Sequence, residues 1–551
     1  MVRSSKHGIV ENQKTKFKGK RLATAFVAFI WFISVLACSQ GYLIPAELTA
    51  TAQLQQSTAS NPTETPTRHS SLTENNPISV APTDPPTAVV TPTSGPTVYI
   101  PSTPTSRPST NTTRTPTILY YTQAGDTLPI LAIRFNVAQN EITSPQPIAP
   151  KNFLNPGQLL IIPNRLGDTT SSTALIPDSE VVYSPSTLDF DMDQYVKNAG
   201  GHLSTYSEYL SNGWNTGAQV VQRIAQENSI NPRLLLSLLE NQSHWVTGQP
   251  DNATDADYPL GYIDGNYQGL FKQLSWVVQK LSIGYYGWRA GLLTELSFQD
   301  GSKLHLAPGL NAGTVAIQYY FSTMYTQKKW STILYSPDGF PALHEKMFDN
   351  PWVRAETVEP LFPPNLVQPK LELPFRPGHT WSLTGGPHSA WGPDGALAAI
   401  DLAPQTSEPG CTTATDYVTA MAPGLVIRSW NGQVMVDLDG DGKEQTGWDI
   451  LYMHIATRDR VPVGTWLNTD DFVGWPSCEG GDATGTHTHI ARKYNGEWML
   501  ADGPIPLDIG GWQAHRGDNP YEGSLTNGDA IATACTCGSS TTLVTRPMSS
   551  H

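Results

Sequence analysis

Gly485-Thr486-His487-Thr488-His489-Ile490 is the stretch of sequence on which the interpretation of this chain depends. Residues two apart on a β-strand project to the same face, so a strand here would direct both imidazoles into one site. Upstream segments supply His388, the carboxylate of Asp401, and His454 at the end of an apolar run. Neutral imidazole and carboxylate oxygen suit Zn²⁺, and a catalytic zinc site keeps three protein ligands and leaves one position to water. The sequence therefore predicts a zinc site.

The region around these residues has the pattern of a β-rich domain. Short runs of β-branched and aromatic residues alternate with glycine-bearing turns, and no long helical period interrupts them. We expect an antiparallel sheet in which loops bring His388 and Asp401 to the strand that carries His489. The expected strands are 425–430, 433–438, 448–455, 486–493 and 497–501.

These motifs resemble the lysostaphin and LytM-type zinc endopeptidases, and more closely their beta-lytic branch. Thr384-Gly385-Gly386-Pro387-His388-Ser389 and the distant Ile400-Asp401 match the longer spacing of that branch, and Tyr452-Met453-His454 and Gly485-Thr486-His487-Thr488-His489 complete the set. The resemblance implies that His388, Asp401 and His489 bind zinc, while His454 and His487 contact the metal-bound water or the developing oxyanion. It implies cleavage of peptide bonds in peptidoglycan. A non-catalytic wall-binding or hydrolase-activating protein is the alternative.

Composition limits the partners and indicates several modules. Acidic residues outnumber basic ones by 48 to 34, and the basic residues form no arginine-rich or lysine-rich stripe, which argues against nucleic acid as a partner. A chain of 551 residues is too long for one ordinary domain. We expect a signal segment at 1–38, a disordered linker rich in Thr, Pro and Ser at 39–117, a small α+β module at 118–165, a mostly α-helical module at 166–364, the β-rich antiparallel-sheet zinc peptidase domain at 365–530 and a tail at 531–551.

The first residues are typical of an export signal. Five basic residues between Lys14 and Arg21 precede an apolar stretch at 22–37. Val35-Leu36-Ala37-Cys38 resembles a bacterial lipobox, whose cysteine becomes lipidated after cleavage. An uncleaved signal anchor or a simple secretory signal is the alternative. We expect a protein outside the cytoplasm, at the bacterial cell envelope, which is attached to the membrane through this segment or secreted.

Residues 118–165 predict a compact unit of strand, helix, helix and strand. Gly125-Asp126-Thr127-Leu128 opens the first helix with a capping Asp or Thr, and Asn155-Pro156-Gly157 is a turn before the closing strand. The unit resembles a LysM domain, a family that binds N-acetylglucosamine-containing glycans such as peptidoglycan. The resemblance implies glycan contacts from Gly125, Asp126, Thr127, Asn155, Pro156 and Gly157. The proline-rich segment Ser144-Pro145-Gln146-Pro147 is expected to shorten or distort the second helix.

The middle of the chain is helical by its apolar spacing. Residues 220–226 and 232–243 carry the pattern, with Asn231 as the cap of the second stretch. That stretch resembles the first long helix of the lysozyme-like transglycosylases, in which an acidic residue directly precedes a serine and protonates the glycosidic oxygen. Gln242 holds this position, and glutamine cannot deliver a proton. Glu240 lies about 200° round the helix and would face away. We expect a non-catalytic, glycan-contacting module, with glycan hydrolysis by this module as the alternative.

Asp437-Leu438-Asp439-Gly440-Asp441-Gly442 copies the opening of a calcium-binding loop, with Asp437, Asp439 and Asp441 at alternate positions. The twelfth position, which needs a bidentate Glu, is Trp448. A glycine-rich hairpin turn explains the same residues without an ion. The sequence leaves both interpretations open.

Four cysteines follow the signal segment, and disulfides are expected in an exported protein. Four cysteines allow three pairings. We prefer Cys411 with Cys478, because both lie inside the expected zinc domain. Zinc ligation by thiolates is the rival interpretation, but no Cys-x-x-Cys spacing supports it.

Overall fold

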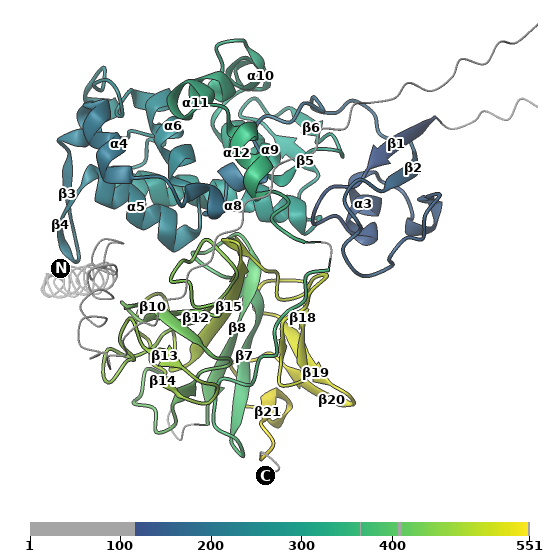
Figure 1. Ribbon diagram of the computed structural model, residues 1–551, viewed down its shortest axis with the longest axis vertical. Helices are drawn as coiled ribbons and strands as arrows, with labels where there is room; N and C mark the ends of the chain where they lie inside the picture. Colours follow the sequence, from purple (N-terminus) through teal and green to yellow (C-terminus); the bar gives the residue numbers. More distant parts are fainter. Residues whose placement is uncertain (1–115, 364, 406–409, 549–551) are drawn as a thin grey trace, which may run out of the picture.

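Three units follow one another in the computed structural model, which describes residues 116–363, 365–405 and 410–548 (Figure 1). An N-terminal unit (residues 117–163) lies beside a helical unit (residues 178–358), and a β unit (residues 371–545) lies below the helices. The expected signal segment and most of the linker lie outside the described residues. Among the helices of the described part of the chain, none combines the length and apolar character that a membrane span requires.

The N-terminal unit has the expected outline with a reduced second helix. β1 (Thr117–Tyr121) pairs antiparallel with β2 (Leu159–Pro163), and α3 (Leu128–Arg134) packs against them. Thr127 caps α3 by accepting a hydrogen bond from the amide of Ile130. The second helix is only the 3₁₀ turn η1 (Gln139–Glu141). Four prolines from position 145 to position 156 explain its brevity, because proline lacks the amide that continues a helix.

The helical unit is built around the 20-residue helix α8 (Leu270–Arg289), which packs against α5 (Gly217–Asn228) and α9 (Ala312–Met324). The helix expected at 232–243 is α6 (Pro232–Ser243), and the Asn231 side chain caps it by accepting a hydrogen bond from the Arg233 amide at 2.9 Å. Apolar spacing thus predicted both helices and the cap. The other elements are α4 (Met192–Ala199), β3 (Ser207–Leu210), β4 (Gly213–Thr216), α7 (Ala253–Asp257), β5 (Glu295–Ser297), β6 (Lys303–His305), α10 (Gln327–Tyr335), α11 (Phe340–Phe348) and α12 (Pro351–Val358).

A buried carboxylate ties the start of this unit to its last helices. Arg354 donates two hydrogen bonds to Glu180, at 2.9 and 3.0 Å, and His344 Nε2 lies 3.2 Å from the same carboxylate. Burial alone would raise the pKa of Glu180, but His344 and Arg354 outweigh it and lower the pKa to about 2. The ionised form of Glu180 therefore stabilises the fold.

We expect Glu180→Gln to lower the free energy of unfolding at pH 7 by about 3 kcal/mol, because it removes one partner of a buried ion pair. A folded pKa below the unfolded value places this stabilisation above pH 4.5, and it is lost as the pH falls from 4.5 toward 2. The difference in the free energy of unfolding between wild type and variant, measured by denaturant titration, should therefore become smaller below pH 4.5. Exposed Glu356→Gln is the control, and a gap that stays constant with pH would contradict the assignment.

The β unit contains a large antiparallel sheet, which confirms the expected strand type. Its strand order is β13-β10-β11-β12-β15-β8-β7-β21, with β16 paired to the end of β15. A four-stranded sheet and the β9–β14 pair complete the unit. The bounds in the large sheet are β7 (Thr380–Ser389), β8 (Leu397–Pro404), β10 (Gly424–Trp430), β11 (Gln433–Asp437), β12 (Trp448–Met453), β13 (Trp466–Leu467), β15 (Thr488–Tyr494), β16 (Glu497–Trp498) and β21 (Leu543–Thr545); the others are β9 (Val418–Thr419), β14 (Phe472–Gly474), β17 (Asp508–Ile509), β18 (Trp512–Arg516), β19 (Gly523–Asn527) and β20 (Ala530–Thr533).

Two expectations about the β unit need correction. The strand expected from residue 486 begins at Thr488, so His487 lies just before β15, in an isolated bridge with Ser477. The segment expected as a tail after residue 530 contributes β21, which pairs with the edge strand β7, Val544 opposite Trp381. Val544 is fully buried, so the last described residues belong to the core of the β unit.

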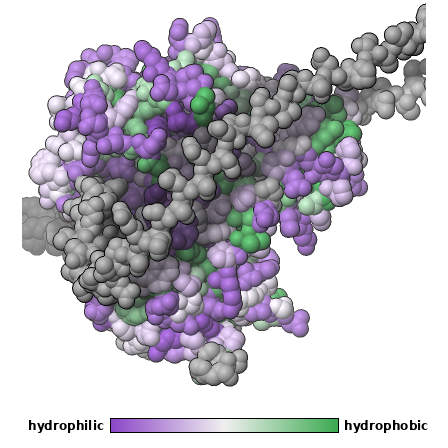
Figure 2. Space-filling view, viewed as in Figure 1, coloured by the Kyte–Doolittle hydropathy of each residue, from purple (hydrophilic) through white to green (hydrophobic). Residues whose placement is uncertain are grey.

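The helical unit and the β unit share one hydrophobic core. Alanines 398, 399 and 491 leave room on the sheet for the aromatic side chains of α8. At the end of α8, Arg289 Nε donates to Glu497 Oε1 at 3.0 Å, and the Tyr286 hydroxyl accepts from the Trp498 amide at 3.0 Å. Figure 2 shows mainly polar residues on the outer surface of this face, with smaller hydrophobic patches between them.

Candidate metal centre and active site

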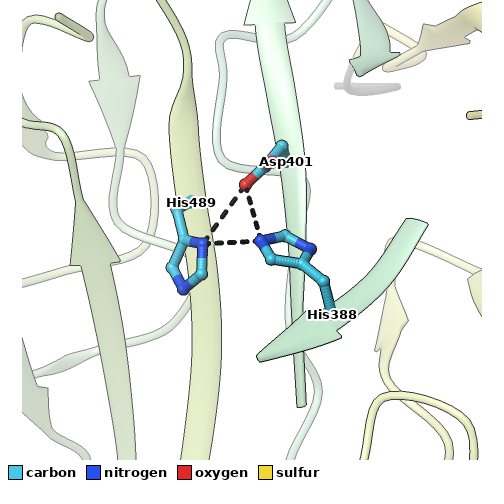
Figure 3. Close-up of side chains that lie close together, drawn as sticks. All are labelled: His388, Asp401 and His489. Atoms are coloured by element: carbon cyan, nitrogen blue, oxygen red, sulfur yellow. Dashed lines mark hydrogen bonds and ion pairs between the residues drawn. The ribbon is translucent and has the colours of Figure 1, made fainter. Parts of the chain in front are cut away.

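Three neighbouring strands bring His388, Asp401 and His489 together (Figure 3). Asp401 on β8 stands directly opposite His489 on β15, and His388 comes from β7 on the other side of β8, beyond an irregularity in the strand register. His388 Nε2 lies 2.9 Å from His489 Nδ1, and Asp401 Oδ1 lies 3.3 and 3.2 Å from these two nitrogens. A tetrahedral ion with bonds of about 2.0–2.1 Å places its ligand atoms roughly 3.3 Å apart. The spacing fits zinc.

Backbone carbonyls determine which ring nitrogen of each ligand carries the proton. His388 Nδ1 lies 2.8 Å from the Gly386 carbonyl, and His489 Nε2 lies 3.1 Å from the Ala390 carbonyl. A carbonyl only accepts hydrogen bonds, so these nitrogens carry the protons of the neutral imidazoles. The nitrogens that face the site are therefore lone-pair donors, as metal ligation requires.

The carboxylate of Asp401 completes the set. Its Oδ1 atom is buried and accepts no hydrogen bond. Burial alone would raise the pKa of Asp401, but the imidazoles of His388, His489 and His487 hold it well below its usual range. A Cβ at Gly385 would lie 2.5 Å from Asp401 Oδ2, so the glycine makes room for the carboxylate. Two lone pairs and an anionic oxygen that face one another without a donor fit a divalent cation.

Two further histidines stand at the same site. The rings of His454 and His487 have centroids 4.4 Å apart, and His487 Nε2 lies 3.7 Å from Asp401 Oδ1. His454 Nδ1 donates to the Glu479 carbonyl at 2.9 Å and His487 Nδ1 to the Gly485 carbonyl at 2.7 Å, so both rings keep Nε2 free. Burial, with His487 and His489 nearby, lowers the pKa of His454 to about 3. His454 is therefore neutral at pH 7, with a lone pair on Nε2.

Tyr521 is a site residue that the sequence did not reveal. Its ring stacks on His388 with centroids 4.1 Å apart, and it lines the same cavity of about 910 Å³ as the four histidines. The Tyr521 backbone has φ +70° and accepts a hydrogen bond from the Gly386 amide at 2.8 Å. Burial and the charges of Asp401 and Asp482 raise the pKa of its hydroxyl. No motif surrounds Tyr521, so only the return of the loop toward β7 places it here.

The acidic hairpin lies away from this centre, between β11 and β12. Asp437, Asp439 and Asp441 offer carboxylate oxygens within 4.8 Å of one another. The amides of Gly440 and Gly442 donate to Asp437 at 3.1 and 2.8 Å, so hydrogen bonds already hold the hairpin. Both interpretations of the motif remain, and calcium stays a prediction.

The residues singled out in the helical unit make internal contacts. Gln242 Oε1 accepts a hydrogen bond from the Tyr325 hydroxyl at 2.8 Å. Glu240 is 7% exposed and accepts hydrogen bonds from the amides of Val246 and Thr247, both at 2.9 Å. Glu240 therefore holds the turn after α6. That the unit contacts glycans without cleaving them stays a prediction.

The residues predicted to contact glycan in the N-terminal unit fall into two groups. Asp126 is buried, 3.0 Å from Arg134, and Thr127 caps α3. A Cβ at Gly125 would lie 2.3 Å from Arg289 of α8, so the helical unit covers this loop. The turn Asn155-Pro156-Gly157 is exposed. Only this turn is free to meet a ligand, and glycan binding stays a prediction.

Comparison with known proteins links the helical unit to a protease. Residues 174–363 match the family described as LasA, N-terminal domain. Protease LasA of Pseudomonas aeruginosa, from strains PAO1 and UCBPP-PA14, is 28% identical over 374 residues, which cover 63% of this chain and 81% of that protein. The relative is a protease by name, in agreement with the peptidase expected from the histidine motifs. The LysM and lysozyme-like resemblances stay predictions.

Solved structures of M23 peptidases match parts of the chain. The M23 metalloprotease pseudoalterin from the deep sea has a TM-score of 0.26 and 19% identity and covers 30% of this chain and 96% of its own. The catalytic domain of lysostaphin from Staphylococcus simulans has a TM-score of 0.17 and 19% identity and covers 22% of this chain and 89% of its own.

Proposed function

We propose that this chain is an exported zinc metalloendopeptidase that hydrolyses peptide bonds in the stem peptides or cross-bridges of peptidoglycan. The observation that carries the proposal is the convergence of His388 Nε2, Asp401 Oδ1 and His489 Nδ1, three electron-pair donors that face one another without a hydrogen-bond donor between them. Zinc held by these residues would polarise the scissile carbonyl and lower the pKa of water. The sequence relative named a protease supports the same reaction class.

In this proposal His454 and His487 move the protons. Each presents a free Nε2 atom to the cavity, since a backbone carbonyl binds its Nδ1–H. One neutral imidazole takes the proton of the attacking water and returns it to the leaving amine. The other, when it carries a second proton on Nε2, donates a hydrogen bond to the carbonyl oxygen as that atom gains charge. The exposed Tyr521 ring, beside His388, offers a surface for the substrate.

The proposed substrate rests on the resemblance of the motifs to peptidases of the cell wall. The LysM-like outline of the N-terminal unit supports capture of a glycan polymer, with the exposed turn Asn155-Pro156-Gly157 as the available surface. An N-terminal lipid or signal anchor would place the enzyme at its substrate and raise its effective concentration there.

Digestion of purified peptidoglycan, followed by mass spectrometry of the released muropeptides, tests the proposal. We expect new amino groups, their loss on treatment with a chelator, and their return with Zn²⁺. Binding to the polymer without bond cleavage would favour a hydrolase-activating protein. Release of reducing sugar that Glu240→Gln abolishes would instead assign hydrolysis to the helical unit.

A further inference from the structure

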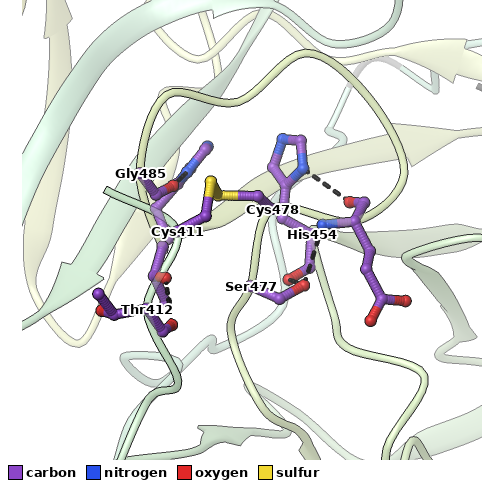
Figure 4. Close-up of a disulfide and its surroundings, with 9 residues drawn as sticks. Cys411, Thr412, His454, Ser477, Cys478 and Gly485 are labelled. Carbon is purple, nitrogen blue, oxygen red and sulfur yellow. Dashed lines mark hydrogen bonds between the residues drawn. A yellow bond between two sulfur atoms is a disulfide. The ribbon is translucent and has the colours of Figure 1, made fainter. Parts of the chain in front are cut away.

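A disulfide joins the two segments that surround the proton-transferring histidines. Cys411 and Cys478 are bonded, 67 residues apart in the chain, with their Cα atoms 5.7 Å apart. Cys411 follows β8, and Cys478 follows β14. Figure 4 shows His454 and Gly485 on either side of this bond.

On the Cys478 side, the neighbouring residues hold His454. Ser477 donates to the His454 carbonyl from its amide at 2.7 Å and from its hydroxyl at 2.9 Å. The carbonyl of Glu479 binds His454 Nδ1 at 2.9 Å and so orients the ring. The residues before and after Cys478 thus determine both the backbone and the ring of His454.

His454 needs this support because its backbone is in the left-handed region, with φ +63°. That conformation is unfavourable for a non-glycine residue and persists only where the surroundings enforce it. Without the contacts of Ser477 and Glu479, we expect the residue to relax and to turn its imidazole away from the cavity.

On the Cys411 side, the neighbouring residues hold the segment of His487. The Gly410 carbonyl accepts from the Thr486 amide at 3.0 Å, and the Thr412 carbonyl accepts from the Thr486 hydroxyl at 2.6 Å. His487 also donates its amide to the Ser477 carbonyl at 3.4 Å, beside Cys478. The disulfide therefore links the two segments that hold His454 and His487.

The three expected zinc ligands are held by residues outside the two segments that the disulfide joins. The carbonyls of Gly386 and Ala390 orient His388 and His489, and Asp401 is held by strand pairing between β8 and β15. We propose that the Cys411–Cys478 disulfide is a positioning device for His454 and His487, required for turnover and not for metal binding. This inference rests on the proposed peptidase function.

The double variant Cys411→Ser/Cys478→Ser tests the inference in the full chain. A misplaced catalytic group costs about a hundredfold, so we expect kcat to fall by 10- to 100-fold while KM stays within about threefold. Zinc content and the visible spectrum of the Co²⁺-substituted protein should stay unchanged, because the three metal ligands are untouched. Thr526→Val is the control, since it removes a side-chain hydrogen bond of the same β unit, the one to His515, and should retain kcat.

An unchanged kcat in the folded double variant would overturn the inference, and so would a parallel loss of zinc, which would make the bond a support of the whole fold. If the double variant does not fold, Thr486→Val decides, because it loosens the Cys411 side while the disulfide remains. We expect kcat to fall by about three- to tenfold there with zinc retained, and an unchanged kcat would again overturn the inference. A wild-type protein that cleaves no peptide bond would instead refute the proposed function itself.

Discussion

His489→Ala should abolish both zinc binding and peptide-bond cleavage. His489 on β15 faces Asp401 on the paired strand β8 and His388 on β7 beyond it, so its removal leaves two ligands where a catalytic zinc site requires three. We expect cleavage of peptidoglycan to fall by at least about a thousandfold, the equivalent of roughly 4 kcal/mol of lost transition-state stabilisation. Release of amino groups measures the rate, and elemental analysis of the purified protein measures zinc per chain.

His515→Ala provides the matched control for this experiment. His515 lies in the same β unit, on β18, and its Nε2 atom is 2.8 Å from the Thr526 hydroxyl. The control should keep its zinc and most of its activity. Full activity in the folded His489→Ala variant, or zinc bound to it at the wild-type level, would contradict the proposal that His489 is a ligand of a catalytic zinc ion.

Local motifs in the sequence were sufficient to predict which residues form the candidate metal site, but they could not predict how these residues are arranged in the sheet. The Thr-His-Thr-His repeat predicted a pair of imidazoles at one site, although His487 lies before the strand rather than within it. The spacing of Asp401 from His388 could not reveal that Asp401 pairs with His489, because strand pairing across β8 and β15 is a long-range contact. Composition gave a wrong prediction at the C-terminus. The segment after residue 530 is rich in Thr and Ser and was expected to be a tail, but its strand β21 pairs with β7.

Tyr521 and the segment around Val544 show why such residues escape prediction. Backbone hydrogen bonds to β7, a strand that is distant in the sequence, hold each of them in place. Hydrophobic periodicity reports the local period of a helix or strand, and it carries no information about which distant edge a short segment joins. The shared core of α8 and the sheet escaped prediction for the same reason, since neither unit alone shows that its apolar face has a partner.

His454→Gln and His487→Gln should separate catalysis from metal binding. Both rings lie within reach of Asp401 and His489, but the three electron-pair donors come from other residues, so each variant should keep its zinc. Glutamine can donate or accept a hydrogen bond but cannot carry the proton from water to the leaving amine, and general acid–base catalysis typically contributes 10²–10⁴-fold.

We therefore expect kcat to fall by about 100- to 1,000-fold in the variant that lacks the proton carrier, with KM little changed. The other variant should retain more activity, because the glutamine amide can still donate a hydrogen bond to the carbonyl oxygen. Steady-state rates on a defined stem peptide, with zinc measured in each sample, identify which imidazole carries the proton. Near-wild-type kcat in both variants would mean that neither ring transfers protons, even though both face the metal ligands.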